Sequence, residues 1–524
     1  MNRHLPCILS AGILLLLAGC QRYSLLMPEN VLSVLEKAGN NRAELQKVFS
    51  HYHKAEDSLK LKAAYFLVGN MSDQAYVTFA VADTAGNEIG FNVLDYRDYD
   101  ALSRAWDSII LVRGPLIQKR TGTTPDYEII TAEYLISNID LAFEAWNYPW
   151  ARRLTFNQFC EYILPYRSTN EPLESWRKPL MDKYAWVLDS VKDREDPLEA
   201  CVLINNDIRS WFRFDPRFYE HATDQGYSEM TGVKMGRCED MTNLAIYSMR
   251  AMGVPVMSDF TPYWAKTGNN HAWNAILDKE GKVIIFMGGE SNPGEYRLDQ
   301  DKAKVYRKTF AVQKGSLASL IKEGEKVPKY IDRSNIIDVT EEYIPVSDIQ
   351  VLLDAPESLG QRFAYLCVFN TGDWCPIHWA LINSGMVTFT RMGRDIAYLP
   401  AYYIEGKVVP ATLPLIPDRE GRIQLIKADP SKTITLRLSS TTKRITLNTT
   451  DNIEKVFLNR GGEYELFYWD AGWISLGKQV ATGGPLVFKN VPAGALYWLV
   501  STKQEKDRPE RIFIVNEKGE TVWY

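Results

Sequence analysis

A cysteine and a histidine are the residues of this chain best placed to do chemistry together. Cys238 follows Gly236 and begins a run whose apolar residues recur at helical spacing. A thiol at a helix N-terminus lies near the positive end of the helix dipole, which favours the nucleophilic thiolate. His271, one of only 6 histidines, lies further along the chain. The two together could supply the nucleophile and the proton acceptor of an acyl-transfer reaction.

Two elements must position this pair. The helix that begins at Cys238 is predicted to bury one face and to end at Gly253-Val254-Pro255. Its apolar positions are Met241, Leu244, Ala245, Ser248-Met249 and Met252. Residues 271–277 predict a strand, 278–281 a turn and 282–287 the returning strand. On these patterns alone, a core cysteine and an unrelated strand histidine remain an alternative.

The flanking residues make the pair more specific. Gly-x-Cys at a helix start, Arg250-Ala251-Met252-Gly253-Val254-Pro255 at its end, and then His271-Ala272-Trp273 before a hairpin resemble the transglutaminase-like superfamily. The resemblance covers roughly residues 200–295. It implies a papain-like α+β fold with a Cys-His-acid triad, in which Cys238 is the nucleophile and His271 the base.

The third member of that triad departs from the family pattern. The resemblance implies an Asp on the returning strand, but here Met287-Gly288-Gly289-Glu290 follows Phe286. With a four-residue turn, His271 would face Gly288, and Glu290 would project to the same face with a longer arm. We therefore predict that Glu290 orients the imidazole. The alternative is a turn glutamate without that role, with Asn269, Asn270, Asn292 or water assisting.

Other residues near the pair have simpler interpretations. Glu239 and Asp240, in the first turn of the helix, are predicted to complement its dipole. Trp264 and Trp273 are the candidates for the walls of a substrate cleft. The aromatic residues before the nucleophile are predicted mainly to pack; they are Trp211, Phe212, Phe214, Phe218, Tyr219 and Tyr227.

The first residues predict export. Arg3 and His4 precede an apolar run over 8–18 that is too short to span a membrane stably, a pattern typical of a secretory signal. Leu17-Ala18-Gly19-Cys20 resembles a bacterial lipobox, which implies cleavage before Cys20 and lipidation of its thiol. Gln21 in the next position favours the outer membrane by the same analogy. No later segment is long and apolar enough to span a bilayer, so we expect a cell-envelope protein anchored by lipid.

Composition excludes some partners. The formal net charge is -5 and no long basic run occurs, which argues against nucleic acid. No Cys/His spacing fits a metal site, and no cofactor is expected. Of the 7 Cys, Cys7 would leave with the signal, and an odd number remains once Cys20 is lipidated, so at least one thiol is free. Cys367 and Cys375 are interpreted as buried free thiols, with a disulfide between them as the alternative.

Five segments are predicted, in a multidomain α+β protein. They are the signal (1–20), a mostly helical N-terminal domain (21–205), the transglutaminase-like domain (206–330) and two β-sandwich domains (331–430 and 431–524). Within the helical domain, 75–81 and 90–94 are expected to pair across a turn at 83–87. The two sandwiches are predicted to be repeats, because four aromatic pairs share one offset: Tyr365 and Tyr464, Trp374 and Trp473, Phe389 and Phe488, Tyr398 and Tyr497.

The function expected from these features is attack on peptide or protein amide bonds through a cysteine thioester. The resemblance to exported bacterial family members implies peptide-bond hydrolysis and cross-linking equally, and hydrolysis is the expectation for this chain. The alternative is a catalytically inactive, glycan- or peptide-binding lipoprotein, motivated by the missing strand Asp and the two sandwiches. The β-domains are expected to position the substrate or to dock a partner.

Overall fold

The computed structural model describes residues 27–524 except 323, 355–359, 446–452 and 504–509. The predicted signal and Cys20 lie outside the described residues. The contacts divide the chain into two compact units. Unit 1 holds the residues up to Ser258 with Trp273–Tyr296 and Thr309–Val312, and unit 2 holds the rest. The finer division into five segments stays a prediction.

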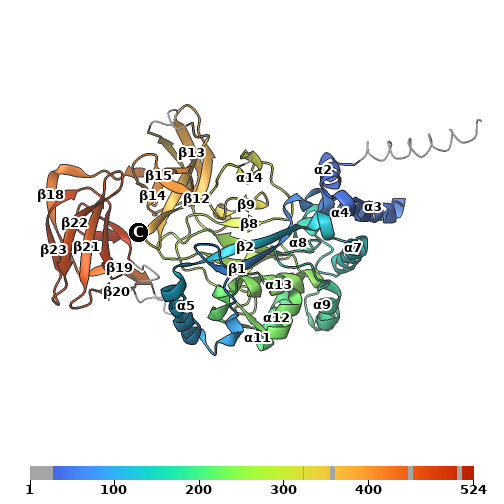
Figure 1. The fold of residues 1–524 in the computed structure, drawn as a ribbon. Coiled ribbons are helices and arrows are strands. Elements are labelled where there is room, and N and C mark those ends of the chain that lie inside the picture. Colours follow the sequence, from blue (N-terminus) through green and yellow to red (C-terminus); the bar gives the residue numbers. More distant parts are fainter. Residues whose placement is uncertain (1–26, 323, 355–359, 446–452, 504–509) are drawn as a thin grey trace, which may run out of the picture. The chain divides into compact units, whose positions relative to one another are not determined.

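Unit 1 is mainly helical and is organised around one buried helix, α13 (Cys238–Ala251). Every residue of α13 from Asp240 onward is buried. Figure 1 shows α9 and α12 beside it, and α7 and α11 also pack against it. The other helices are α2 (Glu29–Lys37), α3 (Arg42–His51), α4 (Ser58–Gly69), α5 (Tyr99–Arg113), α6 (Asp126–Ile129), α7 (Ala132–Trp146), α8 (Phe156–Tyr162), α9 (Arg177–Tyr184), α10 (Val187–Ser190), α11 (Pro197–Trp211) and α12 (Tyr227–Val233).

Local signals explain where several of these helices begin and end. The Thr131 side chain accepts from the N–H of Tyr134 and caps α7, and Pro197 occupies the first turn of α11. Gly253 ends α13 with φ +66, and a Cβ there would lie 2.3 Å from the carbonyl oxygen of Ala145. Only glycine fits that approach, which confirms the predicted helix end.

The predicted hairpin of the N-terminal region is wrong in its second strand. β1 (Ala75–Asp83) pairs antiparallel with β2 (Leu116–Pro125), not with residues 90–94. The turn at 83–87 is confirmed, because Asp83 N–H donates to the Asn87 carbonyl. Phe91 and Val93 instead pack into a small cluster with Leu102 and Phe218. Val93 is therefore buried and Phe91 partly buried without a strand ladder.

The chain passes between the units inside β5 (Val256–Thr261) and β6 (His271–Leu277). In unit 1, β6 pairs antiparallel with β7 (Val283–Phe286), with Leu277 opposite Val283. In unit 2, Asp259 and Phe260 of β5 pair with β8 (Tyr306–Lys308), which pairs with β9 (Ile336–Asp338). The strand predicted to begin at His271 is confirmed.

The rest of unit 2 is β-structure with one short helix, α14 (Leu317–Leu320). Its strands are β10 (Val346–Leu352), β11 (Phe363–Asn370), β12 (Asp373–Leu381), β13 (Met386–Gly393), β14 (Tyr398–Ile404), β15 (Lys407–Pro410), β16 (Leu415–Pro417), β17 (Ile423–Leu425), β18 (Asp429–Leu438), β19 (Ser440–Ile445), β20 (Ile453–Phe457), β21 (Glu463–Trp469), β22 (Trp473–Val480), β23 (Leu486–Ala493), β24 (Tyr497–Ser501), β25 (Ile512–Val515) and β26 (Thr521–Trp523).

These strands repeat one topology. The order β12-β11-β14 recurs as β22-β21-β24, and the pair β10-β13 recurs as β18-β23. Figure 1 shows β21, β22 and β23 together in the C-terminal half of the chain. The hydroxyls of Tyr398 and Tyr497 each donate to the carbonyl five residues earlier, at Gly393 and Pro492. The two tyrosines thus make equivalent hydrogen bonds at equivalent positions of the two repeats. The fold class predicted from the sequence, a multidomain α+β protein, is confirmed.

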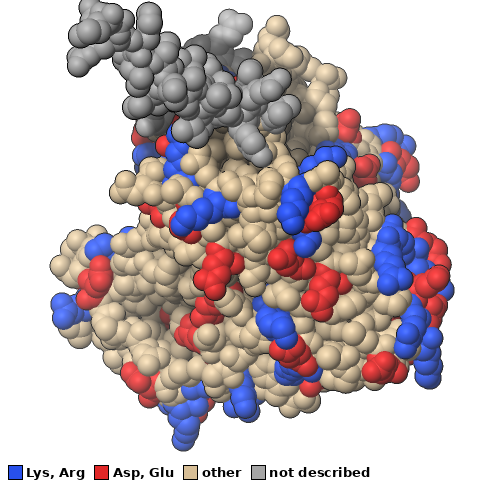
Figure 2. All heavy atoms as spheres, turned by 90° about the vertical axis from the view of Figure 1, so that its right-hand side faces the viewer, with Lys and Arg blue, Asp and Glu red and all other residues tan. Residues whose placement is uncertain are grey.

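The surface carries both signs of charge. On the face in Figure 2, Lys and Arg side chains are interspersed with Asp and Glu rather than gathered by sign. Such a surface produces no strong field of one sign. Among the described residues, no helix has both the length and the hydropathy needed to cross a bilayer.

Candidate active site

Cys238 begins α13 because the chain just before it is tightly held. β4 (Met235–Gly236) pairs in parallel with β3 (Arg213–Phe214). A Cβ on Gly236 would lie 2.6 Å from the Asp240 Cβ and 2.7 Å from the Gln225 Nε2, so only glycine fits there. The Asp240 carboxylate accepts from the N–H of Arg237 at 2.8 Å. Asp240 therefore holds the backbone at the start of α13. Its predicted role in complementing the helix dipole stays a prediction.

The thiol of Cys238 is half-buried and has a tyrosine beside it. The hydroxyl of Tyr219, on the short 3₁₀ helix η5 (Pro216–Glu220), lies 3.7 Å from Sγ. Burial raises the pKa of Cys238, as do the charges of Glu290 and Asp240, whereas the Tyr219 hydroxyl lowers it; the pKa is raised overall. The raised pKa is opposite to the expected stabilisation of the thiolate, because burial and two nearby acids outweigh the Tyr219 hydroxyl and the Cys238 backbone N–H, which both lower it. The thiol is protonated at neutral pH.

Tyr219 is the site residue that the sequence did not reveal. Its neighbours in the aromatic run include buried side chains such as Phe212 and Phe218, but Tyr219 is exposed. Its ring meets Phe214 edge to face, and its hydroxyl reaches the thiol. About half of the Tyr219 side chain stays exposed, but burial of the rest and the charges of Cys238 and Glu290 raise its pKa, so the phenol keeps its proton and can donate it in a hydrogen bond.

Glu290 does not lie where the predicted register put it. Leu277 pairs with Val283, one residue further than a four-residue turn allows. The Asp278 carboxylate accepts from the N–H groups of both Glu280 and Lys282, which widens the turn. A shift of one residue places every side chain of a strand on the other face. The predicted cross-strand pairing of His271 with Gly288 is therefore wrong.

Glu290 instead lies in a tight turn after β7. The Met287 carbonyl accepts from the N–H groups of Glu290 and Ser291, and Gly289 supports the turn with φ +67. Glu290 is exposed. Its charge adds to burial in raising the pKa values of Cys238, Tyr219 and Tyr296. The carboxylate thus belongs with the thiol and two tyrosines in unit 1. Its predicted role toward the imidazole stays a prediction.

The position where the register had placed the family's Asp has no room for one. A Cβ on Gly288 would lie 2.5 Å from the Ala245 Cβ and 2.7 Å from the Met241 carbonyl oxygen. The Gly288 N–H donates to Asn274 Oδ1 at 3.1 Å, and Asn274 Nδ2 donates to the Thr242 carbonyl at 3.2 Å. The turn therefore packs directly on α13, and Asn274 bridges the two.

Asn292, one of the residues considered as an assistant, has a structural role. Its side chain accepts from Asn205 Nδ2 at 3.0 Å and donates to Asn206 Oδ1 at 3.0 Å. Asn205 Oδ1 in turn accepts from the Gly289 N–H at 2.6 Å. These contacts fix the turn that carries Glu290 to helix α11.

His271 is half-buried at the start of β6. The ring of Trp264 stacks on its imidazole, with centroids 5.9 Å apart and planes at 27°. Burial lowers the pKa of His271 to about 4, so the ring is neutral at neutral pH and able to accept a proton. His271 belongs to unit 2 and Cys238 to unit 1, and their pairing stays a prediction.

The two tryptophans predicted as cleft walls are both buried. Trp273 has no exposed surface and packs inside unit 1. Trp264 retains 8% of its surface, stacks on His271, and has Lys302 Nζ 5.9 Å from its ring centre. Trp264 thus supports the imidazole from one side. A contact of either ring with substrate stays a prediction.

The other described thiols differ from Cys238. Cys160, Cys201 and Cys367 are buried, Cys375 is half-buried, and all are free, so Cys367 and Cys375 form no disulfide. Burial raises the pKa of each, that of Cys375 to about 12 with help from Asp373. In the described part of the chain, no group of three or more His, Cys, Asp or Glu is arranged to hold a metal.

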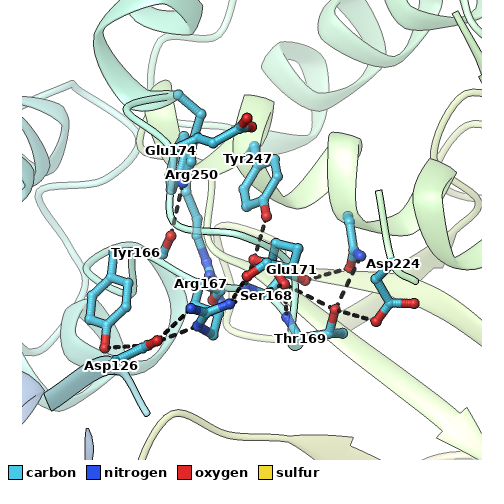
Figure 3. A network of polar contacts seen from close by, with 12 residues as sticks. Asp126, Tyr166, Arg167, Ser168, Thr169, Glu171, Glu174, Asp224, Tyr247 and Arg250 are labelled. Atoms are coloured by element: carbon cyan, nitrogen blue, oxygen red, sulfur yellow. Dashed lines mark hydrogen bonds and ion pairs between the residues drawn. The ribbon is translucent and has the colours of Figure 1, made fainter. Parts of the chain in front are cut away.

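A buried polar network supports α13 from behind. Figure 3 shows Arg167 between Asp126 and Glu171. Arg167 donates from Nε to Asp126 Oδ2 at 2.8 Å and from Nη2 to Oδ1, and Tyr166 donates to the same carboxylate at 3.0 Å. Tyr247 of α13 donates to Glu171. The arginine thus joins α6 to the helix that carries the nucleophile.

The same network reaches the first turns of α13. Ser168 donates to Asn243 Oδ1 at 2.7 Å, and Asn243 Nδ2 donates to Thr169 at 3.3 Å. Thr169 also donates to Asp224, which pairs with Arg237 immediately before the nucleophile. The position of Cys238 is therefore fixed by side chains that do not touch the thiol.

A family model matches the part of the chain that carries Cys238 and His271. Residues 184–286 match the model of the transglutaminase-like superfamily. No curated protein matches the chain. Among solved structures, a candidate cysteine protease from Cytophaga hutchinsonii aligns at 19% identity over 23% of this chain and 44% of its own length, with a TM-score of 0.16. The alignment therefore spans less than half of that relative.

Red sea bream transglutaminase aligns at 11% identity over 87% of this chain and 78% of its own, with a TM-score of 0.21. The family assignment rests on the family model and on the elements it covers, from the end of α9 to β7. The matched segment contains the helix that begins at Cys238 and the strand that begins at His271, and this part of the chain is therefore transglutaminase-like.

Proposed function

We propose that the protein is a lipid-anchored cell-envelope enzyme that cleaves peptide or protein amide bonds through a thioester on Cys238. The observation that carries the proposal is the placement of this one thiol. It begins a buried helix, inside the segment matched by the superfamily, and it retains access to solvent. Anchorage through Cys20 rests on the lipobox-like sequence.

The reaction starts from a neutral pair. A protonated thiol and a neutral imidazole are the forms expected at neutral pH from the directions of their pKa shifts. As Cys238 Sγ attacks the carbonyl carbon, His271 takes the thiol proton. N–H groups in the first turn of α13 have no partner within the helix and can donate to the oxyanion.

The intermediate collapses by breaking the C–N bond. His271 returns its proton to the departing amine, and the acyl group stays on Sγ as a thioester. Water then attacks the thioester, His271 takes a proton from that water, and the acid and the free thiol are released. An amine in place of water would give transfer, and we propose hydrolysis as the main outcome.

Selective labelling of the thiol tests the proposal. The purified mature protein is treated with a thiol-directed electrophile across a pH series, and the modified sites are mapped by mass spectrometry. We expect Cys238 to react first, and its rate to rise through and beyond the usual thiol pKa of about 8.5, because burial and two acids raise its pKa. Labelling of Cys238 no faster than of Cys160 or Cys201 would favour a non-catalytic binding protein.

Glu290→Gln separates two roles for that carboxylate. Because the Glu290 charge raises the pKa of Cys238, we expect labelling of the variant to shift to lower pH. If Glu290 also orients His271, turnover of the variant falls; if it acts only on the thiol, turnover at neutral pH holds or rises. The matched control is Glu295→Gln, in the same segment, which should leave both profiles unchanged. An unchanged labelling profile in Glu290→Gln would contradict the assignment to the thiol.

A further inference from the structure

The loop before the candidate base has an irregular backbone. Residues 262–270 join β5 to His271, and within them 264–270 form a loop that the Trp264 N–H closes by donating to the Asn269 carbonyl at 3.0 Å. Asn269 adopts φ +64, a conformation that asparagine tolerates better than most residues. Since the Trp264 ring stacks on His271, the shape of this loop determines where the imidazole lies.

A side chain from β11 reaches the carbonyls of the loop. Asn370 ends β11 and is buried, with 1% of its surface exposed. Its Nδ2 lies within hydrogen-bonding distance of three loop carbonyls: Trp264 at 3.1 Å, Thr267 at 2.9 Å and Asn269 at 3.0 Å. The carbonyls of an irregular loop lack a regular strand ladder, so the buried Asn370 amide adds to the Trp264–Asn269 bond in satisfying them.

The turn after Asn370 explains its orientation. Thr371 and Gly372 both have positive φ, at +50 and +89, which makes the β11–β12 connection a tight turn that matches the twist of its strands. The turn also packs against the loop, because a Cβ on Gly268 would lie 3.2 Å from the Thr371 methyl. The β11–β12 turn and the loop therefore pack closely against each other.

A second buried donor comes from the last strands. Arg511 precedes β25 and donates from Nη2 to the Ala265 carbonyl at 2.9 Å and from Nη1 to the Thr267 carbonyl at 3.4 Å. The same guanidinium donates to the carbonyls of Phe369 and Tyr524, at 2.6 and 3.0 Å. One planar group thus ties the loop to both C-terminal sheets.

We propose that Asn370 and Arg511 are positioning residues for the candidate base, and that the C-terminal sheets of unit 2 serve to hold the loop that presents His271. The inference rests on the proposed function only in treating His271 as the catalytic base. The contacts from which it is argued are independent of that function. They are five hydrogen bonds from two buried side chains to the main chain of one seven-residue loop. The charged groups beside the loop are Lys302 over Trp264, Lys266 with Asp301 and Asp395, and Arg511 itself.

The test measures the loop directly. Hydrogen–deuterium exchange of peptides covering 264–271 is compared in the full mature wild type, in Asn370→Ala and in Arg511→Lys. Lysine keeps the charge but cannot reach all the carbonyls that surround the planar fork. We expect exchange of the loop to rise about tenfold or more in both variants, since its anchoring bonds are lost. The His271 ring, followed by NMR, should then titrate above its pKa of about 4, toward the usual 6.5, as water reaches it.

Tyr402→Phe is the matched control. Tyr402 is buried in β14, and its hydroxyl donates to the Asp354 carbonyl at 3.1 Å rather than to a carbonyl of the loop. It should leave loop exchange and the His271 titration at wild-type values. Peptides from β21 and β24 report in each variant whether the second sandwich stays folded. Wild-type exchange and wild-type titration in both Asn370→Ala and Arg511→Lys would overturn the inference. Because neither readout needs turnover, an inactive wild type whose loop still loosens in the variants would refute only the proposed function.

Discussion

His271→Asn is expected to lower kcat/KM for amide hydrolysis by about 10²–10⁴-fold, the usual contribution of a positioned general base. The loss is large here because the thiol does not ionise on its own: burial, Glu290 and Asp240 raise the pKa of Cys238. Asparagine fills a similar space and cannot take the proton. The measurement is initial-rate hydrolysis of a peptide library, followed by full pH profiles on the best substrate.

The lowered pKa of His271 also determines how turnover should change with pH. Burial lowers the pKa of His271 to about 4, so the ring is in its basic form above that pH. Activity of the wild type should therefore persist in mild acid and fall only as pH approaches about 4. The variant should lose that acid limb and gain rate only at alkaline pH, where hydroxide removes the thiol proton.

Two further variants test whether turnover depends on the Cys238 thiol. Cys238→Ala should reduce turnover to background and abolish a trapped thioester, whereas Cys375→Ala, at the other half-buried thiol, should leave turnover unchanged. A His271→Asn protein with wild-type turnover and an unchanged pH profile would remove His271 from the mechanism. Turnover that survives in Cys238→Ala would remove the thiol chemistry altogether.

The elements that carry these two residues could be predicted because they are locally encoded. Apolar residues at helical spacing after Cys238 and a glycine with positive φ at Gly253 mark the face and the end of α13 in the local sequence. β-branched and apolar residues define β6 in the same way, beginning at His271. The repeated tyrosine corners of Tyr398 and Tyr497 also left a signal, since one constant offset runs through both sandwiches.

The position of Glu290 could not be predicted because it depended on one residue of turn length. The pattern 278–281 fits a four-residue turn, but Asp278 holds a wider one and Gly281 adopts φ +81. The resulting shift moves every later side chain relative to the strand opposite. Turn composition reports that a turn exists, not how many residues it contains.

Tyr219 and β2 were missed for a different reason. Tyr219 stands in a run of aromatic residues that mostly pack, and only the path of η5 brings its hydroxyl to the thiol. β2 (Leu116–Pro125) carries Lys, Arg and Thr residues, and its partner β1 lies well before it in the sequence, with a helix between them. Contacts between distant segments leave no local pattern, so the chemistry of the thiol's surroundings became visible only in the fold.

The network behind α13 consists of buried charged side chains that hold the helix in place only while their charges are paired. Asp126, Arg167 and Glu171 are almost fully buried, so each charge depends on the others. Burial alone would raise the pKa of Glu171, but Arg167, the N–H of Ser168 and the Tyr247 hydroxyl outweigh it and lower that pKa. The ionised Glu171 therefore adds stability above the ordinary glutamate pKa of about 4.3, and this contribution is lost as pH falls through its lower native value.

Arg167→Met is expected to destabilise unit 1 by about 3–5 kcal/mol, because it leaves two buried carboxylates without their cation. The loss should be largest at neutral pH and smaller in acid, where Asp126 and Glu171 can take up protons and no longer need the arginine. Urea unfolding followed by tryptophan fluorescence measures it, with exchange of α13 peptides to assign the transition to unit 1. The matched control is Lys178→Ala, which breaks the exposed pair with Asp182 and should cost only about 0–1 kcal/mol. If Arg167→Met were as stable as the control, or if its deficit grew in acid, the buried ion pairs would not be what holds α13 in place.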